Sequence, residues 1–324
     1  MTTLEVINLR VSYGRGHERV RAVDNVSFRI PQAGVLGLVG ESGSGKSTIA
    51  RAIVGLAPIE SGQVLLDDVP VNTAPRGRIS MVFQDPFASL NPRMTIASAL
   101  GEVVAVTGHV RRADRGREVA RLLDLVHLTS AQGERFPAQL SGGQRQRAAI
   151  ARALASSPSV LVADEITSAL DVSVQATILN VLREVLARTQ VSMLFISHNL
   201  SVVRYVSSEV AVMHCGQIVE YTDNQSLFSA PQHPYTEVLI SSIPTLAAHV
   251  DTDATVVDGE PPDPGAPPVG CRFHPRCPVG PLVRPDRIAC IDSDPADTAG
   301  QRVHRAACHF AAPATAAAAA AAPG

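Results

Sequence analysis

Nine residues near position 40 have the types and the spacing needed to hold a chain of phosphates. Residues 40–48 are Gly-Glu-Ser-Gly-Ser-Gly-Lys-Ser-Thr, which matches the pattern G-x-x-x-x-G-K-[ST] on Gly40, Gly45, Lys46 and Ser47. Glycines let successive backbone N–H groups point at one anion, and the N-terminus of a following helix adds partial positive charge. The lysine ammonium can reach the terminal phosphates, and the serine hydroxyl can bind Mg²⁺. The stretch predicts a phosphate-binding loop.

Lys46 is the single lysine of the chain, and every other basic residue except histidine is an arginine. Such a bias keeps lysine where a compact ammonium must fit among phosphates, because a planar guanidinium is not equivalent there. The alternative is a glycine turn that matches by chance. The apolar run 35–39 before the loop and the helical pattern of 49–56 after it supply the strand, loop and helix that the motif needs.

Acidic, amide and imidazole side chains follow three further predicted strands. Asp164 and Glu165 end one buried run, Gln84 follows a second and His198 follows a third. Open α/β sheets bind ligands at the carboxyl ends of their strands, so these side chains are expected at the phosphate site. One carboxylate can hold Mg²⁺ through water and the other can orient or deprotonate an attacking water. The alternatives are an acidic helix cap, a solvated glutamine and a structural histidine.

A second anion site is predicted where a helix begins after Leu140. The next residues are Ser141-Gly142-Gly143-Gln144. Serine is a preferred N-cap, and the glycines leave backbone N–H groups free at the positive helix end. Ser-Gly-Gly alone is a common capping turn, whereas the five-residue sequence that starts at Leu140 is much rarer.

These residues depend on elements that the apolar periodicity predicts. Strands are expected over 4–11, 20–30, 35–39, 63–67, 79–83, 160–165, 191–196, 210–213 and 217–221, the last two as a hairpin. Helices are expected over 49–56, 96–126 with a polar interruption at 107–114, 141–156 and 174–188. Tyr13 is either an ordinary aromatic residue at a strand end or a platform for a nucleotide base. The pattern predicts an α/β fold.

Four of the five cysteines lie in one short stretch near the C-terminus. Cys215 stands alone in the predicted hairpin, where a packed thiol is expected. The other four are Cys271, Cys277, Cys290 and Cys308, and their intervals lack the C-x₂-C pairs of common zinc sites. In a reducing compartment, clustered thiols indicate a metal more than disulfides. From the residues alone, an iron–sulfur cluster, a zinc ion and unligated thiols all stay open.

Composition limits the classes of function. With 324 residues, 45% of them hydrophobic, the chain can form one large domain with an appendage, or two domains. The formal net charge is −2, so no overall basic field attracts nucleic acid or an anionic membrane. The first residues lack a signal-peptide pattern, and no apolar run reaches the roughly 20 residues of a membrane helix. A cytosolic protein is therefore predicted.

Together these stretches resemble the ATP-binding subunit of an ABC transporter, over residues 4 to about 244. The matching motifs are Walker A at 40–48, the Q-loop at Gln84, the signature at 140–144, Walker B at 161–165, the D-loop at 168–171 and the H-loop at His198. Within that superfamily the chain is similar to the peptide and nickel uptake group, on residues 84–86, 89–94, 233–236 and 270–278. Ile166 departs from the family, which usually has proline there.

The resemblance implies a P-loop ABC-type ATPase domain over 1–243, with a RecA-like core, an antiparallel β subdomain and a helical subdomain at about 87–156. It implies an oligopeptide-transporter-type extension with a four-cysteine motif over 244–310. Residues 311–324 are expected to form a disordered, alanine-rich tail. Related peptide-transporter ATPases can carry a [4Fe–4S] cluster in this extension, so Cys271, Cys277, Cys290 and Cys308 would ligate it, with zinc as the alternative.

The resemblance also implies ATP and Mg²⁺ as cofactors. Glu165 would be the general base, His198 the γ-phosphate sensor and Lys46 a phosphate ligand, while Ser47, Gln84 and Asp164 would hold Mg²⁺. The remaining nucleotide-binding set would be Tyr13, stacked on adenine, with Gly40, Ser42, Gly43, Ser44, Gly45 and Thr48. Ser141, Gly142, Gly143, Gln144 and Asp171 would complete it, and Ser141 and Gly143 would touch the γ-phosphate held by a partner subunit.

The implied partners are a second ABC ATPase subunit, two transmembrane permease subunits and an extracytoplasmic substrate-binding protein. The chain would then power import of oligopeptides or dipeptides from the cytoplasmic face of the cell membrane. The alternative is a soluble ABC-type ATPase that acts on nucleic acid, for example in DNA repair. Such proteins carry two cassettes, long coiled coils or basic zinc modules. This chain shows one cassette, and its C-terminal arginines are interleaved with acids, so no nucleic-acid partner is expected.

Overall fold

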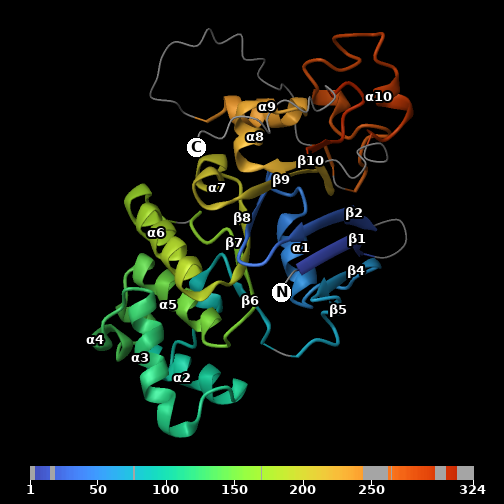
Figure 1. Cartoon of the computed structure of the whole chain (residues 1–324). Helices are drawn as coiled ribbons and strands as arrows, with labels where there is room; N and C mark the ends of the chain where they lie inside the picture. Colours follow the sequence, from blue (N-terminus) through green and yellow to red (C-terminus); the bar gives the residue numbers. More distant parts are fainter. Residues whose placement is uncertain are drawn as a thin grey trace, which may run out of the picture.

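The centre of the molecule is a mainly parallel β-sheet (Figure 1). The computed structural model describes residues 4–14, 19–75, 77–168, 170–243, 262–263, 265–295 and 304–311. In these ranges the central sheet has the order β11-β10-β9-β3-β8-β7-β6. Its strands are β3 Val35–Val39, β6 Ile79–Val82, β7 Val160–Asp164, β8 Ser192–Ser197, β9 Glu209–His214, β10 Gln217–Asp223 and β11 Arg305–Ala306.

The parallel strands are buried and end on one edge. β3, β7 and β8 are almost wholly apolar, and every residue in them is buried, as expected for strands covered on both faces. β9, β3, β8, β7 and β6 pair in parallel, so their carboxyl ends share one edge of the sheet. The predicted functional residues Gly40, Gln84, Glu165 and His198 all follow those ends.

A second, antiparallel sheet has the order β2-β1-β4-β5. Its strands are β1 Leu4–Tyr13, β2 Val20–Ile30, β4 Ser61–Leu66 and β5 Val69–Pro70. Apolar residues of this sheet, such as Leu9, share one core with Ile49 of helix α1 (Lys46–Ile53) and with Leu194 of β8. The helix that follows the phosphate loop is therefore enclosed between the two sheets.

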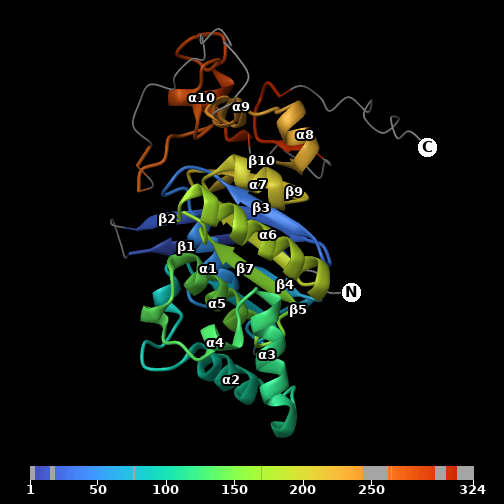
Figure 2. The same cartoon turned by 90° about the vertical axis from the view of Figure 1, so that its left-hand side faces the viewer.

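Helices cover the other face of the central sheet and extend away from it (Figure 2). They are α2 Ile96–Thr107, α3 Arg115–Leu125, α4 Ser130–Gly133, α5 Gly142–Leu154, α6 Val172–Thr189 and α7 Leu200–Val206. The predicted polar interruption corresponds to the connection between α2 and α3, where Gly108 ends α2 with a φ of 69°. None of the helices described combines the length and the apolar character needed to span a bilayer.

The C-terminal arm, defined as residues 265–295 and 304–311, packs on the end of the molecule opposite α2 (Figures 1 and 2). It follows α8 Asn224–Ser229 and α9 Pro234–Ser241, and contains α10 Ala289–Asp292. Strand β11 pairs antiparallel with β10, so the arm extends the central sheet. Phe273 is 1% exposed and lies against the ring of Tyr235.

Most predicted elements are confirmed, with differences at their ends. Helix α1 begins at Lys46 rather than Ile49, because the loop winds directly into a first turn in which the Ile49 N–H donates to the Gly45 carbonyl. Helices α4 and α7 to α10 and strands β5 and β11 were not predicted, since each is too short to show a clear periodicity. Residues 244–261, in the predicted extension, and 312–324, in the predicted tail, lie outside the described residues.

Candidate functional site

The phosphate loop, residues 40–48, joins the end of β3 to α1. Gly40 and Gly45 have φ angles of 154° and 106°, which other residues rarely adopt. A Cβ atom at Gly40 would lie 2.1 Å from the Met213 carbonyl oxygen, and one at Gly45 would lie 2.2 Å from the Ala22 carbonyl oxygen. Both positions therefore require glycine for the backbone angle and for space.

The Lys46 ammonium lies inside the loop. The residue is 4% exposed, and its Nζ donates to the carbonyl oxygens of Gly40 (2.8 Å) and Glu41 (2.7 Å) and to Ser44 Oγ (3.2 Å). Burial lowers the Lys46 pKa, and the nearby carboxylates oppose that shift. Because all three acceptors are neutral, an anionic phosphate oxygen would be a stronger partner for this ammonium.

Ser47 and Asp164 connect the loop to β7. Ser47 Oγ donates to Asp164 Oδ1 at 3.0 Å, although the residues are far apart in the sequence. Burial raises the pKa of the Asp164 carboxyl; the bond from Ser47 opposes this, and the charge of Glu165 adds to it. A hydroxyl and a carboxylate at one point form the oxygen-rich environment that Mg²⁺ prefers.

Three more predicted residues converge beside this pair. Gln84 Nε2 donates to Glu165 Oε2 and to Ser168 Oγ, each at 3.3 Å. His198 Nδ1 lies 3.5 Å from Glu165 Oε1. Glu165 has a φ of 47°, and its N–H donates to the Ile196 carbonyl of β8 at 3.0 Å. A strained backbone held by its surroundings is common at functional sites.

The other predicted nucleotide-binding residues lie along the loop and at the end of β1. Ser42 and Gly43 are exposed, Ser44 is buried and Thr48 is half-buried in α1. Tyr13 is the last residue of β1 and is 40% exposed, so its side chain is accessible from solvent.

The signature residues lie at the N-terminus of α5. Ser141 and Gln144 form a reciprocal capping box, with Gln144 N–H donating to Ser141 Oγ (3.3 Å) and Ser141 N–H to Gln144 Oε1 (3.0 Å). Gly142 and Gly143 form the first helical residues. Asp171 caps α6 by accepting from the Val174 N–H. In the described part of the chain, no hydrogen bond or ion pair joins residues 141–144 to the phosphate loop.

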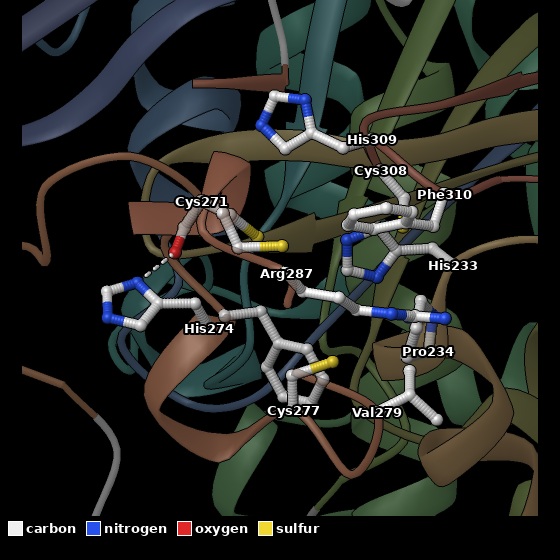
Figure 3. Close-up of a pocket in the computed structure, with 12 residues that line it drawn as sticks. His233, Pro234, Cys271, His274, Cys277, Val279, Arg287, Cys308, His309 and Phe310 are labelled. Atoms are coloured by element: carbon white, nitrogen blue, oxygen red, sulfur yellow. Dashed lines mark hydrogen bonds between the residues drawn. The ribbon is translucent and has the colours of Figure 1, made fainter. Parts of the chain in front are cut away.

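The four cysteines of the C-terminal arm line one small cavity, here called the thiol cavity (Figure 3). Burial raises the pKa of Cys271 to about 12 and that of Cys277 to about 11, with smaller contributions from the neighbouring thiols. The Cys271 N–H donates to the Cys290 carbonyl at 2.9 Å, and Cys308 completes the set. Arg287 also lines the cavity. Within the described ranges, no group of three or more His, Cys, Asp or Glu side chains is arranged to hold one metal ion.

Cys215 lies outside the thiol cavity, in the turn between β9 and β10. Its Sγ is 3.4 Å from His214 Nε2, and burial raises its pKa to about 11. These contacts agree with the packed thiol expected at this position.

Sequence reasoning missed residues that contact the phosphate loop from a distance. Glu41 forms a bidentate ion pair with Arg276 of the arm, and its N–H donates to Tyr235 Oη at 3.0 Å. Ser168, which lies in the predicted D-loop, accepts a hydrogen bond from Gln84 Nε2, a contact that the motif alone does not predict. No spacing rule connects residues so far apart, so only the folded chain could reveal these contacts.

A phosphate loop between the sheet and a helix, with polar residues on the adjoining strand ends, defines a P-loop nucleoside triphosphatase. The family model described as ABC transporter matches residues 23–168, and the one described as oligopeptide/dipeptide transporter, C-terminal region, matches residues 219–280. A peptide import ATP-binding protein of Brucella ovis is 43% identical over 85% of this chain and 89% of its own length. One of Brucella abortus is 46% identical over 80% of this chain and 79% of its own length.

Solved structures agree with this assignment. The dimeric ATP-binding cassette MJ0796, in a post-hydrolysis state with ADP and Pi, is 27% identical and superposes with a TM-score of 0.61 over 68% of this chain and 98% of its own. The fold is shared with cbiO1 of Clostridium perfringens, with a TM-score of 0.63 over 70% of this chain and 90% of that one, at 24% identity. The chain belongs to the ABC transporter family and is an ATPase of that family, with the C-terminal region found in oligopeptide and dipeptide transporters.

Proposed function

We propose that this chain binds and hydrolyses ATP to power an importer of oligopeptides or dipeptides. The observation that carries the catalytic part is the convergence of Gln84, Glu165 and His198 beside the Ser47–Asp164 hydrogen bond. The names of the Brucella relatives and the C-terminal family match support the peptide substrate.

Each residue of the site has a proposed role. Lys46 and the N–H groups of Gly40, Ser42, Gly43, Ser44, Gly45 and Thr48 bind the phosphates, and Tyr13 stacks on adenine. Ser47, Gln84 and Asp164 would hold Mg²⁺, which would supply positive charge against the phosphates. Glu165 takes the proton of the attacking water, and His198, close to the same carboxylate, contacts the γ-phosphate.

The proposed assembly contains a second ATPase subunit, two permease subunits and an extracytoplasmic binding protein, with this chain on the cytoplasmic face of the membrane. Support for the second ATPase comes from the signature end of α5, which is not bonded to the phosphate loop of its own chain in the described ranges. Ser141, Gly142, Gly143 and Gln144 then face the ATP of the partner. The start of α6, capped by Asp171, lies near them, since Leu170 is close to Gly142 and Val174 is close to Gly143.

Two measurements test this function. Glu165→Gln removes the base and keeps the shape, so ATP turnover in the assembled complex should fall by about 1000-fold while ATP binding persists. Undiminished turnover would refute the catalytic assignment.

Peptide-loaded binding protein should stimulate ATPase activity of the reconstituted complex. Stimulation by another solute class, and not by peptides, would refute the substrate.

We also propose that the thiol cavity holds a [4Fe–4S] cluster. Four thiols line one cavity, and four cysteine thiolates are the ligand set of a [4Fe–4S] cluster. Arg287 offers positive charge to the thiolates, since it lowers the pKa of Cys277, Cys290 and Cys308 against the effect of burial. Such a group would cross-link an arm that has little core of its own.

Anaerobic purification tests the cluster. The protein should contain about four irons and absorb broadly at about 400 nm. Cys277→Ser should remove both signals, and Cys215→Ser, the matched control outside the cavity, should keep them. Colourless protein that contains stoichiometric zinc would show that the cavity holds zinc instead of the cluster. Protein without metal would refute both assignments.

A further inference from the structure

The carboxylate of Glu41 is bound from outside the phosphate loop. Its two oxygens accept hydrogen bonds from both terminal nitrogens of Arg276, at 2.9 and 3.0 Å. The Arg276 side chain is 12% exposed and that of Glu41 is 29% exposed. A two-point, charge-assisted contact fixes the orientation of the carboxylate as well as its distance.

The backbone of Glu41 is also held on both sides. Its N–H donates to the hydroxyl of Tyr235, a residue that is 1% exposed. Its carbonyl oxygen accepts from Lys46 Nζ at 2.7 Å and from the Ser44 N–H at 3.2 Å. The resting position of the Lys46 ammonium therefore depends on where Glu41 is held, and part of that hold comes from Arg276.

The segment that carries Arg276 is firmly packed. Arg276 ends a short 3₁₀ turn, His274–Arg276, directly before Cys277. Phe273, at the start of the turn, packs its ring against His214 and Tyr235, with centroids 5.4 and 5.3 Å apart. A side chain that positions another group must itself be fixed by its surroundings, and this packing meets that requirement.

Arg272 provides a second attachment of the same segment. Its guanidinium donates to the Asp24 carboxylate and to the Cys215 carbonyl. Gly216, which follows Cys215 in the turn between β9 and β10, donates its N–H to the Ser44 carbonyl at 2.9 Å. The arm therefore reaches the phosphate loop by two separate routes.

We propose that Arg276 is a positioning residue for ATP binding. Through Glu41 it holds the first residues of the phosphate loop, here called the loop entrance, in the geometry that accepts the nucleotide. This inference rests on ATP binding at the phosphate loop, as proposed above. It makes the C-terminal arm a part of the nucleotide site, although the arm contributes no phosphate ligand. Since Arg276 adjoins Cys277, the arm's attachment and the loop's geometry depend on the same short segment.

The sign of one effect separates positioning from simple electrostatics. Glu41→Gln removes a negative charge that repels the triphosphate, so long-range electrostatics alone predicts tighter ATP binding. Loss of the bidentate contact predicts weaker binding, because the loop entrance is released. Arg276→Ala is expected to weaken binding under both views, so Glu41→Gln is the decisive variant.

The experiment measures ATP affinity by calorimetry on the full-length chain. Arg276→Ala and Glu41→Gln should each raise the Kd about five- to tenfold, and the double variant should be no worse than either single one, because both remove the same interaction. Arg276→Lys keeps the charge but loses the second hydrogen bond, so its Kd should be intermediate. In the assembled complex, KM should rise while kcat stays within about twofold of the wild type.

Arg284→Ala is the matched control, since Arg284 is an exposed arginine of the same arm, and its Kd should equal that of the wild type. The inference is overturned if folded Glu41→Gln protein binds ATP more tightly, or if folded Arg276→Ala protein binds it as the wild type does. If Arg276→Ala fails to fold, Glu41→Gln and Arg276→Lys decide by the same criteria. Wild-type protein that binds no ATP would refute the proposed function itself, which is a separate result.

Discussion

The N-termini of α1 and α5 carry the two parts of the proposed nucleotide site, and they differ in what satisfies their first N–H groups. Helix α1 begins after Gly45, which has no side chain to cap it. Helix α5 begins after Ser141, which forms a complete capping box with Gln144. Both ends have the partial positive charge of a helix N-terminus, but a side chain caps one of the first donors of α5, the Gln144 N–H, and caps none in α1.

This difference indicates what each end can do alone. An uncapped helix end with a buried ammonium beside it can bind a phosphate within one chain. At α5 the capping box already occupies the Gln144 N–H, so fewer donors are open to a phosphate there and other contacts must bring it. One chain is therefore expected to bind ATP at α1, while the α5 end contributes only when a partner presents its nucleotide.

The largest expected effect is at α1. Lys46→Ala should weaken ATP binding by the isolated chain on the order of 1000-fold, because the ammonium is the only charged donor that the loop itself supplies. Lys46→Arg should lose most of the affinity as well, since a guanidinium does not fit among the loop oxygens. Calorimetry measures both variants, and binding within tenfold of the wild type would contradict the phosphate-loop assignment.

A large effect confined to the assembled complex is expected at α5. Ser141→Arg should reduce turnover by about 100-fold, because a long side chain blocks the approach of the partner's nucleotide. Its ATP affinity as an isolated chain should not change. The matched control is Thr129→Arg, at the N-cap of α4, which has the same kind of capping box. Loss of monomer binding in Ser141→Arg would contradict the separation of the two ends.

A smaller effect is expected from Ser47→Ala. The variant removes the hydroxyl that bonds Asp164, so Mg-ATP affinity should fall about tenfold while the affinity for ATP without Mg²⁺ changes little. Calorimetry with Mg²⁺ and with a chelator separates the two effects. Equal losses in both conditions would show that Ser47 acts on the loop geometry and not on the metal.

The smallest effects concern the caps themselves. Ser141→Ala and Thr129→Ala should each lower the free energy of unfolding by about 1 kcal/mol, a shift in Tm of roughly 2–4 °C. Only Ser141→Ala should also change turnover in the complex. A Tm equal to that of the wild type in Ser141→Ala would mean that the capping box of α5 contributes nothing in solution.

Local features of the site were predictable because their signals lie within a few residues of one another. The loop glycines, Lys46 and Ser47 form one continuous stretch, and Ser141 is recognisable as a cap from the residues that follow it. The continuous apolar runs of β3, β7 and β8 indicated buried strands. The convergence of Gln84, Glu165 and His198 could be expected as well, because each follows a parallel strand and those strands end on one edge of the sheet.

Contacts between distant segments were decided only by the tertiary structure. Arg276 and Glu41 are separated by 235 residues, and Tyr235 and Glu41 by 194. Strand β11 has two residues, too few for any periodicity, and forms because β10 offers it an edge. A capping turn or a phosphate loop is specified by neighbours in the sequence, whereas an ion pair across the fold depends on how every element between its partners packs.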